Sequence, residues 1–361
     1  MTPTRKVGPG SGGGVPRDYC DAMHDGMDMS ALPPLGWSEF FGTWSLQPGW
    51  LFAVLVLGSL YVSGRSLAGP SSTVPRWRAA SFLGGLALLW VVVASSIGGY
   101  AMSLAWMHMV LHLALIMVIP ALLVLGHPLT VLVEAFTGTR QERARRMLRS
   151  MPFAILFSPA MGVLVYTVVI VGTHLTHFMD HMATNSGLMT GEQVVYVVAG
   201  WLFLLPLIGE EPIRSDLPYL GRIALLVVGM IPDTIVGIVM LQTERNLFPI
   251  YSAMRPSWAL DPVRDIQTAG GLMWAGGDGG MMFIAIGLVV AVITSPRRRA
   301  RMTGAFLESV RRVNLTVPDD AHSDDWADAD QDPATALDPD SDEALAAYNR
   351  RLAALNREHG G

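Results

Sequence analysis

Charged residues are scarce in this sequence, and cysteine is nearly absent. Only 15% of the 361 residues are charged, whereas 51% are hydrophobic, and the mean hydropathy is positive at +0.39. A soluble globular domain of this composition would expose too much apolar surface to stay in solution. The single cysteine, Cys20, has no partner in the chain, which excludes an internal disulfide. The composition therefore indicates a membrane protein without a disulfide framework.

Seven segments have almost no charge and about the length needed to cross a hydrocarbon core of roughly 30 Å. They are residues 48–64, 79–97, 103–125, 153–174, 192–208, 218–241 and 271–294. The sequence thus predicts an all-α, polytopic transmembrane bundle of about seven spans within residues 48–296. No apolar segment precedes the first span, so we expect no cleavable signal peptide and an N-terminal tail, residues 1–47, that remains on the protein.

Arginine falls mainly in the short connections between alternate spans. Loops of this kind are retained on the cytoplasmic side of a membrane. The arginine-rich segments follow the first, third and seventh predicted spans, whereas the connections after the second and fourth spans carry no arginine. The longer connection between the sixth and seventh spans disagrees, with three arginines. We therefore expect the N-terminus outside and the C-terminus in the cytoplasm, and topology rather than nucleic-acid binding explains the arginines.

The C-terminal segment, residues 297–361, is basic at first and then strongly acidic. From about residue 316 its acids are mixed with Pro and Ala, so it has too little apolar surface to fold alone. We expect a disordered cytoplasmic tail. Residues 343–357 have the pattern of a short amphipathic helix, for which a solvated helix is the simpler interpretation.

Soft metal ligands are concentrated in ten residues of the N-terminal tail, which is expected to be extracytoplasmic. The candidate ligands there are Cys20, Met23, His24, Met27 and Met29. Thioether, thiolate and imidazole together suit Cu(I), whereas Mg²⁺ and Ca²⁺ prefer oxygen ligands. The pattern predicts that this tail contacts copper; the alternative is an unstructured tail with accidental methionines.

Histidines also mark the outer ends of two predicted spans. His108 and His112 are four residues apart at the start of the third span, so they share one helical face, with Met109 beside it. His174, His177 and His181 would stack along one edge at the end of the fourth span if its helix continues that far, and Asp180 could orient one of the rings. Imidazoles within a membrane span need a partner, so these groups predict a metal site.

Acidic residues and glycines accompany the last two spans. Asp265 and Met273 lie at the start of the seventh span, where glycines would let neighbouring helices approach closely. Asp278 within that span should face the protein interior and be paired or protonated. For Asp233 and Asp278, a structural hydrogen bond and a role in an ion path both remain open.

Several of these motifs together resemble a known family. They are His108 and His112 followed by Pro120 and Leu125–Gly126–His127–Pro128, the histidine-bearing end of the fourth span, and the segment from Asp265 to Trp274. Over about residues 45–295 they resemble the CtaG family of cytochrome c oxidase assembly factors associated with caa3-type oxidases, a family distinct from the single-span copper chaperones of the same name. The matched positions are His108, His112, His174, Asp265, Gln267, Met273 and Trp274. Ile266 departs from the polar residue expected beside Asp265, and both tails lie outside the matched region.

The resemblance implies a non-enzymatic role in maturing a haem–copper oxidase, whose subunits would be partners, in a bacterial cell membrane. It also implies help in delivering copper to that oxidase. Together with the soft ligands of the tail, this leads to the hypothesis that the tail captures Cu(I), the intramembrane histidines receive it, and the oxidase is then supplied. A copper transporter is one alternative, which the lack of a conspicuous inverted repeat disfavours. A membrane haem or quinone redox protein is another alternative. A haem would need His174 or His177 as the axial ligand opposite a histidine of the third predicted span, and a Soret band would reveal it.

Overall fold

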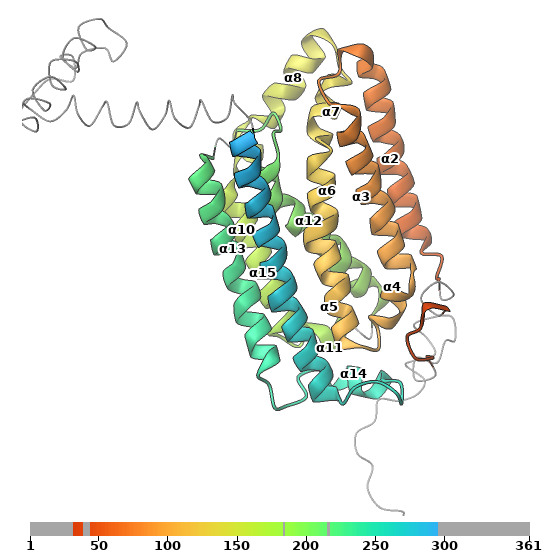
Figure 1. Ribbon diagram of the computed structural model, residues 1–361. Helices are drawn as coiled ribbons and strands as arrows, with labels where there is room; N and C mark the ends of the chain where they lie inside the picture. The colour runs from red at the N-terminus through yellow and green to blue at the C-terminus, as the bar shows by residue number, and fades with distance from the viewer. Residues whose placement is uncertain (1–31, 39–43, 183–184, 215–216, 295–361) are drawn as a thin grey trace, which may run out of the picture. The chain divides into compact units, whose positions relative to one another are not determined.

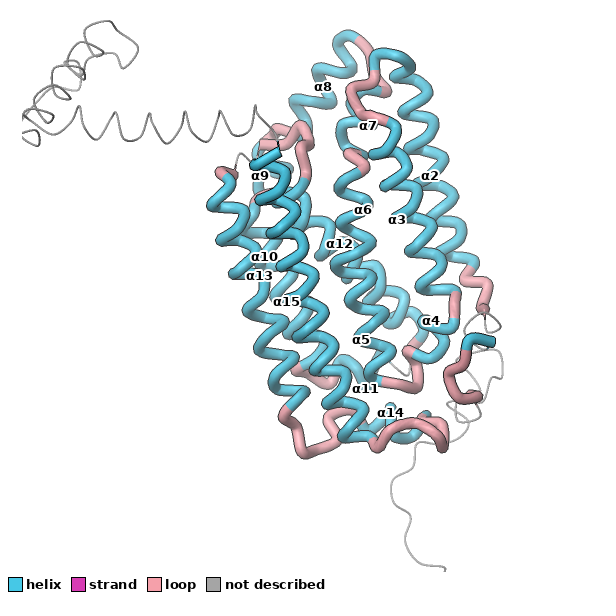
Figure 2. Tube along the Cα trace, in the orientation of Figure 1, coloured by secondary structure: helices cyan, strands magenta, loops and turns pink. Residues whose placement is uncertain are grey.

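The computed structural model describes residues 32–38, 44–182, 185–214 and 217–294 (Figure 1). These residues form helices and connecting loops, and no strand occurs among them (Figure 2). The chain divides into two compact units, residues 1–286 and 287–361. The described residues of the second unit, 287–294, are the last turns of one helix. The helix packing that positions the candidate site belongs to the first unit.

Six helical segments among the described residues are long and apolar enough to cross a membrane. They are α2 (Pro48–Ala68), α3 (Arg76–Ala94), a segment comprising α5 (Ala105–Leu113), η4 (Ala114–Val118), α6 (Ile119–Leu125) and α7 (Pro128–Glu134), then α12 (Ser186–Ile208), α13 (Tyr219–Leu241) and α15 (Pro262–Thr294). The prediction of an all-α, polytopic transmembrane bundle is confirmed. The side of the membrane on which each terminus lies stays a prediction.

The remaining predicted span, residues 153–174, is not one continuous helix. It is divided into α9 (Met151–Leu156) and α10 (Pro159–His174). The Ser158 side chain accepts the backbone N–H of Met161, and Pro159 takes the first helical position, so a new helix begins there. α10 has only 16 residues and packs against α12 and α13. The total of seven spans therefore also stays a prediction.

Glycines permit close packing inside the bundle, as expected for the last span. A Cβ atom on Gly270 would lie 2.5 Å from the backbone nitrogen of Leu241, and one on Gly280 would lie 1.9 Å from the Met117 sulfur. These positions bring α15 against α13 and η4. Large apolar side chains such as Phe52 and Phe283 are exposed on the outside of the bundle, where lipid would surround them.

The two ends of the bundle carry different side chains. The arginine-rich α8 (Gly138–Leu148) lies at the end where α2 finishes and α3 starts (Figure 1). The short helices α4 (Ser96–Tyr100), α11 (Phe178–Met182) and α14 (Pro249–Met254) lie at the opposite end. At that second end α5 and α12 begin and α10 finishes. The histidine-bearing ends therefore meet at the end of the bundle opposite α8.

Candidate metal centre

His108 and His112 lie on one face of α5, a single turn apart. Their ring centroids are 4.1 Å apart, and the two residues are 1% and 4% exposed. The start of α5 is held by the Asp265 carboxylate, which accepts the backbone N–H groups of Ala105 at 2.9 Å and Trp106 at 3.2 Å. These N–H groups have no partner within the helix, so a carboxylate there fixes the helix end. The two rings are thus presented to the interior by an anchored helix.

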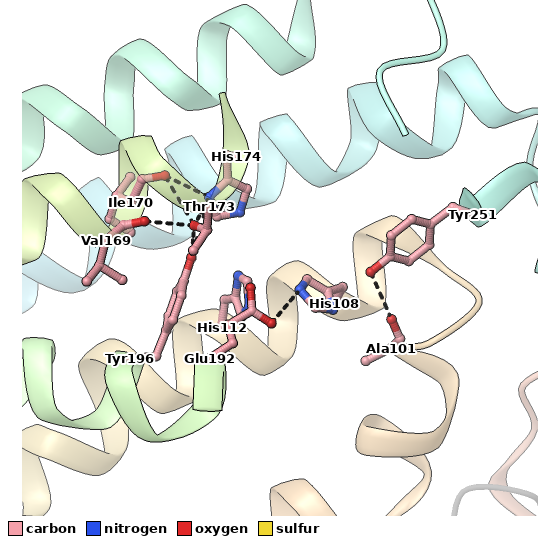
Figure 3. Close-up of polar contacts among 10 residues, drawn as sticks. All are labelled: Ala101, His108, His112, Val169, Ile170, Thr173, His174, Glu192, Tyr196 and Tyr251. Atoms are coloured by element: carbon pink, nitrogen blue, oxygen red, sulfur yellow. Dashed lines mark hydrogen bonds and ion pairs between the residues drawn. The ribbon is translucent and has the colours of Figure 1, made fainter. Parts of the chain in front are cut away.

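Glu192, near the start of α12, meets both histidines (Figure 3). Its Oε2 lies 3.7 Å from His108 Nε2, and its Oε1 lies 3.5 Å from His112 Nε2. Ligand atoms of all three residues lie within 4.8 Å of one another. Ligand atoms about 2.1 Å from a tetrahedral metal ion are separated by about 3.4 Å, so these spacings fit a shared ion. Sequence reasoning missed Glu192, although a carboxylate in an apolar span signals a functional site.

His174, the last residue of α10, lies beside this trio. Its ring centroid is 5.3 Å from that of His112. His174 Nδ1 lies 3.0 Å from the Ile170 carbonyl oxygen, which can only accept, so Nδ1 carries the proton. The hydrogen bond leaves the Nε2 lone pair of His174 free for another partner, in the manner of an oriented metal ligand.

Several buried polar atoms in this region have no hydrogen bond. They are both ring nitrogens of His108 and of His112, Nε2 of His174 and Oε1 of Glu192. Most buried side-chain polar atoms in folded proteins are paired, and each exception needs an explanation. Imidazole and carboxylate are ligands of copper and zinc. The unpaired atoms therefore fit a cation that bonds to several of them at once.

Two tyrosines enclose the histidines. Tyr196 from α12 stacks on the His112 ring at a centroid distance of 3.9 Å, and its hydroxyl lies 2.6 Å from Thr173 Oγ1. Tyr251 from α14 lies edge-on to His108 at 5.9 Å. Burial, and then the nearby Glu192 carboxylate, raise the pKa of the Tyr251 phenol well above its ordinary value. Tyr251 therefore stays neutral while it covers the histidines.

The predicted ligands Met109 and Met273 come together beside the histidines. Both side chains are buried, and both line a small cavity that is also lined by His112, His174 and Asp233. The volume of this cavity is about 10 Å³, close to the space that one water-sized sphere requires. The structure thus places residues with thioether and imidazole groups around one small cavity.

Asp265 is placed differently from the other predicted ligands. Both of its oxygens accept hydrogen bonds from the start of α5, as described above, and it does not belong to the trio of His108, His112 and Glu192. Gln267 donates from Nε2 to the Thr243 carbonyl at 2.9 Å. Trp274 packs by its Cβ close to Gly237 of α13. These residues of α15 hold helices together.

His177 and His181 do not stack with His174 along one helical edge. That prediction required α10 to continue, but α10 ends at His174 and a separate helix, α11, starts at Phe178. The Thr176 hydroxyl donates to the Gly172 carbonyl and accepts the Phe178 N–H, which replaces helical bonding locally. The side chains of His177 and His181 are both exposed, unlike those of the buried histidines His108, His112 and His174.

The other candidate ligands of the N-terminal tail lie outside the described residues. They are Cys20, Met23, His24, Met27 and Met29. Nothing in the structure bears on their arrangement, so contact between copper and this tail remains a prediction.

The intramembrane acids Asp233 and Asp278 both accept hydrogen bonds. The Tyr166 hydroxyl donates to Asp233 Oδ2 at 2.5 Å, and the Thr234 hydroxyl donates to Asp278 Oδ2 at 2.8 Å. Asp278 is half-buried and paired, as expected. Asp233 also lines the cavity that Met109 and Met273 line.

Comparison with known proteins gives relatives in mycobacteria. Uncharacterized proteins of Mycobacterium bovis and Mycobacterium tuberculosis are each 26% identical to this chain over 318 residues, which cover 84% of the chain and 43% of each relative. One of Mycobacterium leprae is 25% identical over 332 residues, 88% of the chain and 45% of the relative. The chain therefore spans less than half the length of these curated relatives. No solved structure gives a significant match.

A family model described as cytochrome c oxidase caa3 assembly factor matches residues 55–295. That range contains most or all of each of the six segments that could cross a membrane, together with His108, His112, His174 and Glu192. The tail residues with soft ligands lie outside it. The resemblance drawn from the sequence is confirmed, and this chain belongs to the family of cytochrome c oxidase caa3 assembly factors.

Proposed function

We propose that this protein binds copper between its membrane helices and delivers it to a haem–copper oxidase during assembly. The observation that carries the proposal is the convergence of His108, His112 and Glu192, in which both histidine Nε2 atoms and Glu192 Oε1 are buried without a hydrogen bond. Copper is the cargo of this reaction rather than a resident cofactor. No chemical conversion is required, so the protein acts as a metallochaperone of the respiratory chain and not as an enzyme.

The proposed place of the site is the outer side of a bacterial cell membrane. In the sequence, arginine-rich loops mark the cytoplasmic side, and in the fold the histidines belong to the opposite end. The Met-rich tail also belongs to the expected outer side. A relay from Cys20, Met23, His24, Met27 and Met29 to the buried histidines is then possible without crossing the membrane.

The packing around the histidines favours a metal ion over a haem. A haem needs a pocket of several hundred cubic ångströms, the range of small-molecule sites in general. The cavity between His112 and His174 is about 10 Å³, and Tyr196 stacks directly on His112. We therefore prefer copper binding to the haem alternative, and a visible spectrum without a Soret band is the expected result.

Anaerobic titration of the purified full-length protein with Cu(I) tests the proposal. Wild type is compared with His108→Ala/His112→Ala, which removes two of the three converging side chains. We expect the variant to bind at least one equivalent of Cu(I) fewer than wild type. Equal stoichiometry in both proteins would rule out the intramembrane site.

A matched control is His177→Ala/His181→Ala, which removes two exposed histidines from the same end of the bundle. We expect it to bind as many copper ions as wild type. For delivery, each variant is produced in a bacterium whose own family member is deleted, and the copper content of the purified oxidase is measured. We expect the control variant to restore the copper content of the oxidase, and the His108→Ala/His112→Ala variant not to restore it.

A further inference from the structure

Next to the converging trio, the cavity lined by two methionines has the composition of a second metal position. The trio offers two imidazoles and one carboxylate. The cavity offers His174, Met109 and Met273, with His112 on the boundary between the two. We propose that this cavity binds Cu(I) through thioether sulfur, as a position distinct from that at Glu192. The inference rests on the proposed copper function.

The state of His174 supports a ligand role in the cavity. Its Nδ1 proton is committed to the Ile170 carbonyl, and its Nε2 has no hydrogen bond although the side chain is 3% exposed. A ring held in this way presents a lone pair at a fixed orientation. An ion bound in the cavity that His174 lines would therefore give its Nε2 a partner.

The methionines determine which ion the cavity would prefer. Met109 is 1% exposed and Met273 is 3% exposed, on α5 and α15 respectively. Thioethers are soft ligands, suited to Cu(I) and poor for Mg²⁺, Ca²⁺ or Mn²⁺. The Glu192 carboxylate of the trio, by contrast, is a harder ligand and also suits harder ions than Cu(I). The two positions therefore differ in selectivity, and transfer from the Glu192 position to the cavity would favour Cu(I).

Asp233 gives the cavity a means of balancing the ion's charge. Its buried carboxyl group lines the same space and is held by the Tyr166 hydroxyl. A cation in a low-dielectric interior needs a compensating charge nearby. Neither His174 nor a thioether supplies one, so Asp233 in its ionised form would do so.

X-ray absorption at the copper edge tests the inference. Because the tail also contains sulfur, the background is the full-length chain with Cys20→Ser, Met23→Leu, Met27→Leu and Met29→Leu. We expect this protein, loaded anaerobically with Cu(I), to show copper–sulfur scattering. Adding Met109→Leu/Met273→Leu should abolish that scattering. It should also lower the affinity for one equivalent of Cu(I) by about tenfold or more.

Leucine replaces methionine with nearly the same volume, so the substitutions should leave the fold intact. Met281→Leu is the matched control, because Met281 is also buried in α15 but does not line the cavity. It should retain the sulfur scattering. Copper bound in the background protein by nitrogen and oxygen alone would overturn this inference and leave the proposed function standing. No bound copper in either protein would overturn both.

Discussion

Asp265 and Ala105 are joined by a hydrogen bond across 160 residues of sequence, with the Asp265 carboxylate accepting the Ala105 N–H at 2.9 Å. The bond connects the start of α15 to the start of α5. His108 and His112 follow within two turns of that point. The carboxylate therefore fixes the helix that carries the histidines, and its influence on copper would act through their position.

Replacing Asp265 with alanine should destabilise the protein by about 1–2 kcal/mol, the usual cost of losing a helix cap. Two N–H groups at the start of α5 lose their acceptor, and the His108 and His112 rings lose a fixed position. Thermal unfolding in detergent measures the first effect and Cu(I) affinity the second. We expect both to change together. A variant with unchanged stability and lost copper binding would instead support the sequence prediction that Asp265 is itself a ligand.

Replacing Glu192 with glutamine should weaken metal binding at the trio by about tenfold, or 1.4 kcal/mol. Glutamine keeps the size of the side chain but removes the negative charge between two histidines. The loss should be greater for Cu(II) than for Cu(I), because a carboxylate is the harder ligand. Competition with a chelator of known affinity measures both ions. Equal affinities in wild type and variant would exclude Glu192 as a ligand.

The helix period predicted the pairing of His108 and His112, since residues four apart share a face in any α-helix. Apolar segments likewise predicted the membrane helices, because the bilayer imposes their length. Glu192 was beyond this reasoning. It joins the histidines only through the packing of α12 on η4 and α6, a long-range contact that one sequence does not reveal.

His177 and His181 illustrate a different limit. Their spacing is helical, but the chain leaves the helix after His174, where Thr176 bonds to the backbone on both sides. Such local competition decides helix ends, which periodicity alone places poorly. The break between α9 and α10 at Ser158 and Pro159 has a clearer signal, a capping residue followed by proline.

Gly200 should be among the least replaceable positions of α12. A Cβ atom there would lie 1.9 Å from the Ile116 carbonyl oxygen, within the π-helical turn η4 that follows His112. We expect Gly200→Ala to force α12 and η4 apart and to cost about 1–3 kcal/mol. Because α12 also carries Glu192, copper affinity should fall with stability. Thermal unfolding and Cu(I) titration of the same variant check both.

Gly191 provides the control for this substitution. It also lies in α12, next to Glu192, but a Cβ atom there would meet nothing within 4 Å. Gly191→Ala should therefore be neutral or stabilise the helix by up to about 1 kcal/mol, since alanine is the better helix former. Equal destabilisation by both substitutions would contradict the close packing of α12 on η4.

Glu211, in the loop after α12, holds the start of α7 at the arginine-rich end. Its carboxylate accepts the N–H groups of Leu129 and Thr130 at 3.1 and 2.8 Å and the Thr130 hydroxyl at 2.6 Å. Burial nevertheless raises the pKa of Glu211 from 4.5 to about 7, against the lowering effect of these bonds. The folded protein therefore retains this proton at pH values where the unfolded chain has lost it.

Stability should in consequence decrease as pH rises through this window. Between about pH 4.5 and pH 7 the folded state binds more protons at Glu211 than the unfolded state, so its contribution is greatest below the window and is lost as pH passes 7. The decrease is at most about 1.4 kcal/mol per pH unit. Glu211→Gln cannot titrate there, so its unfolding free energy should fall less between pH 5 and pH 8 than that of wild type, by measurements in the same detergent. Parallel pH profiles for the two proteins would show that Glu211 ionises normally in the fold and that its three hydrogen bonds outweigh its burial.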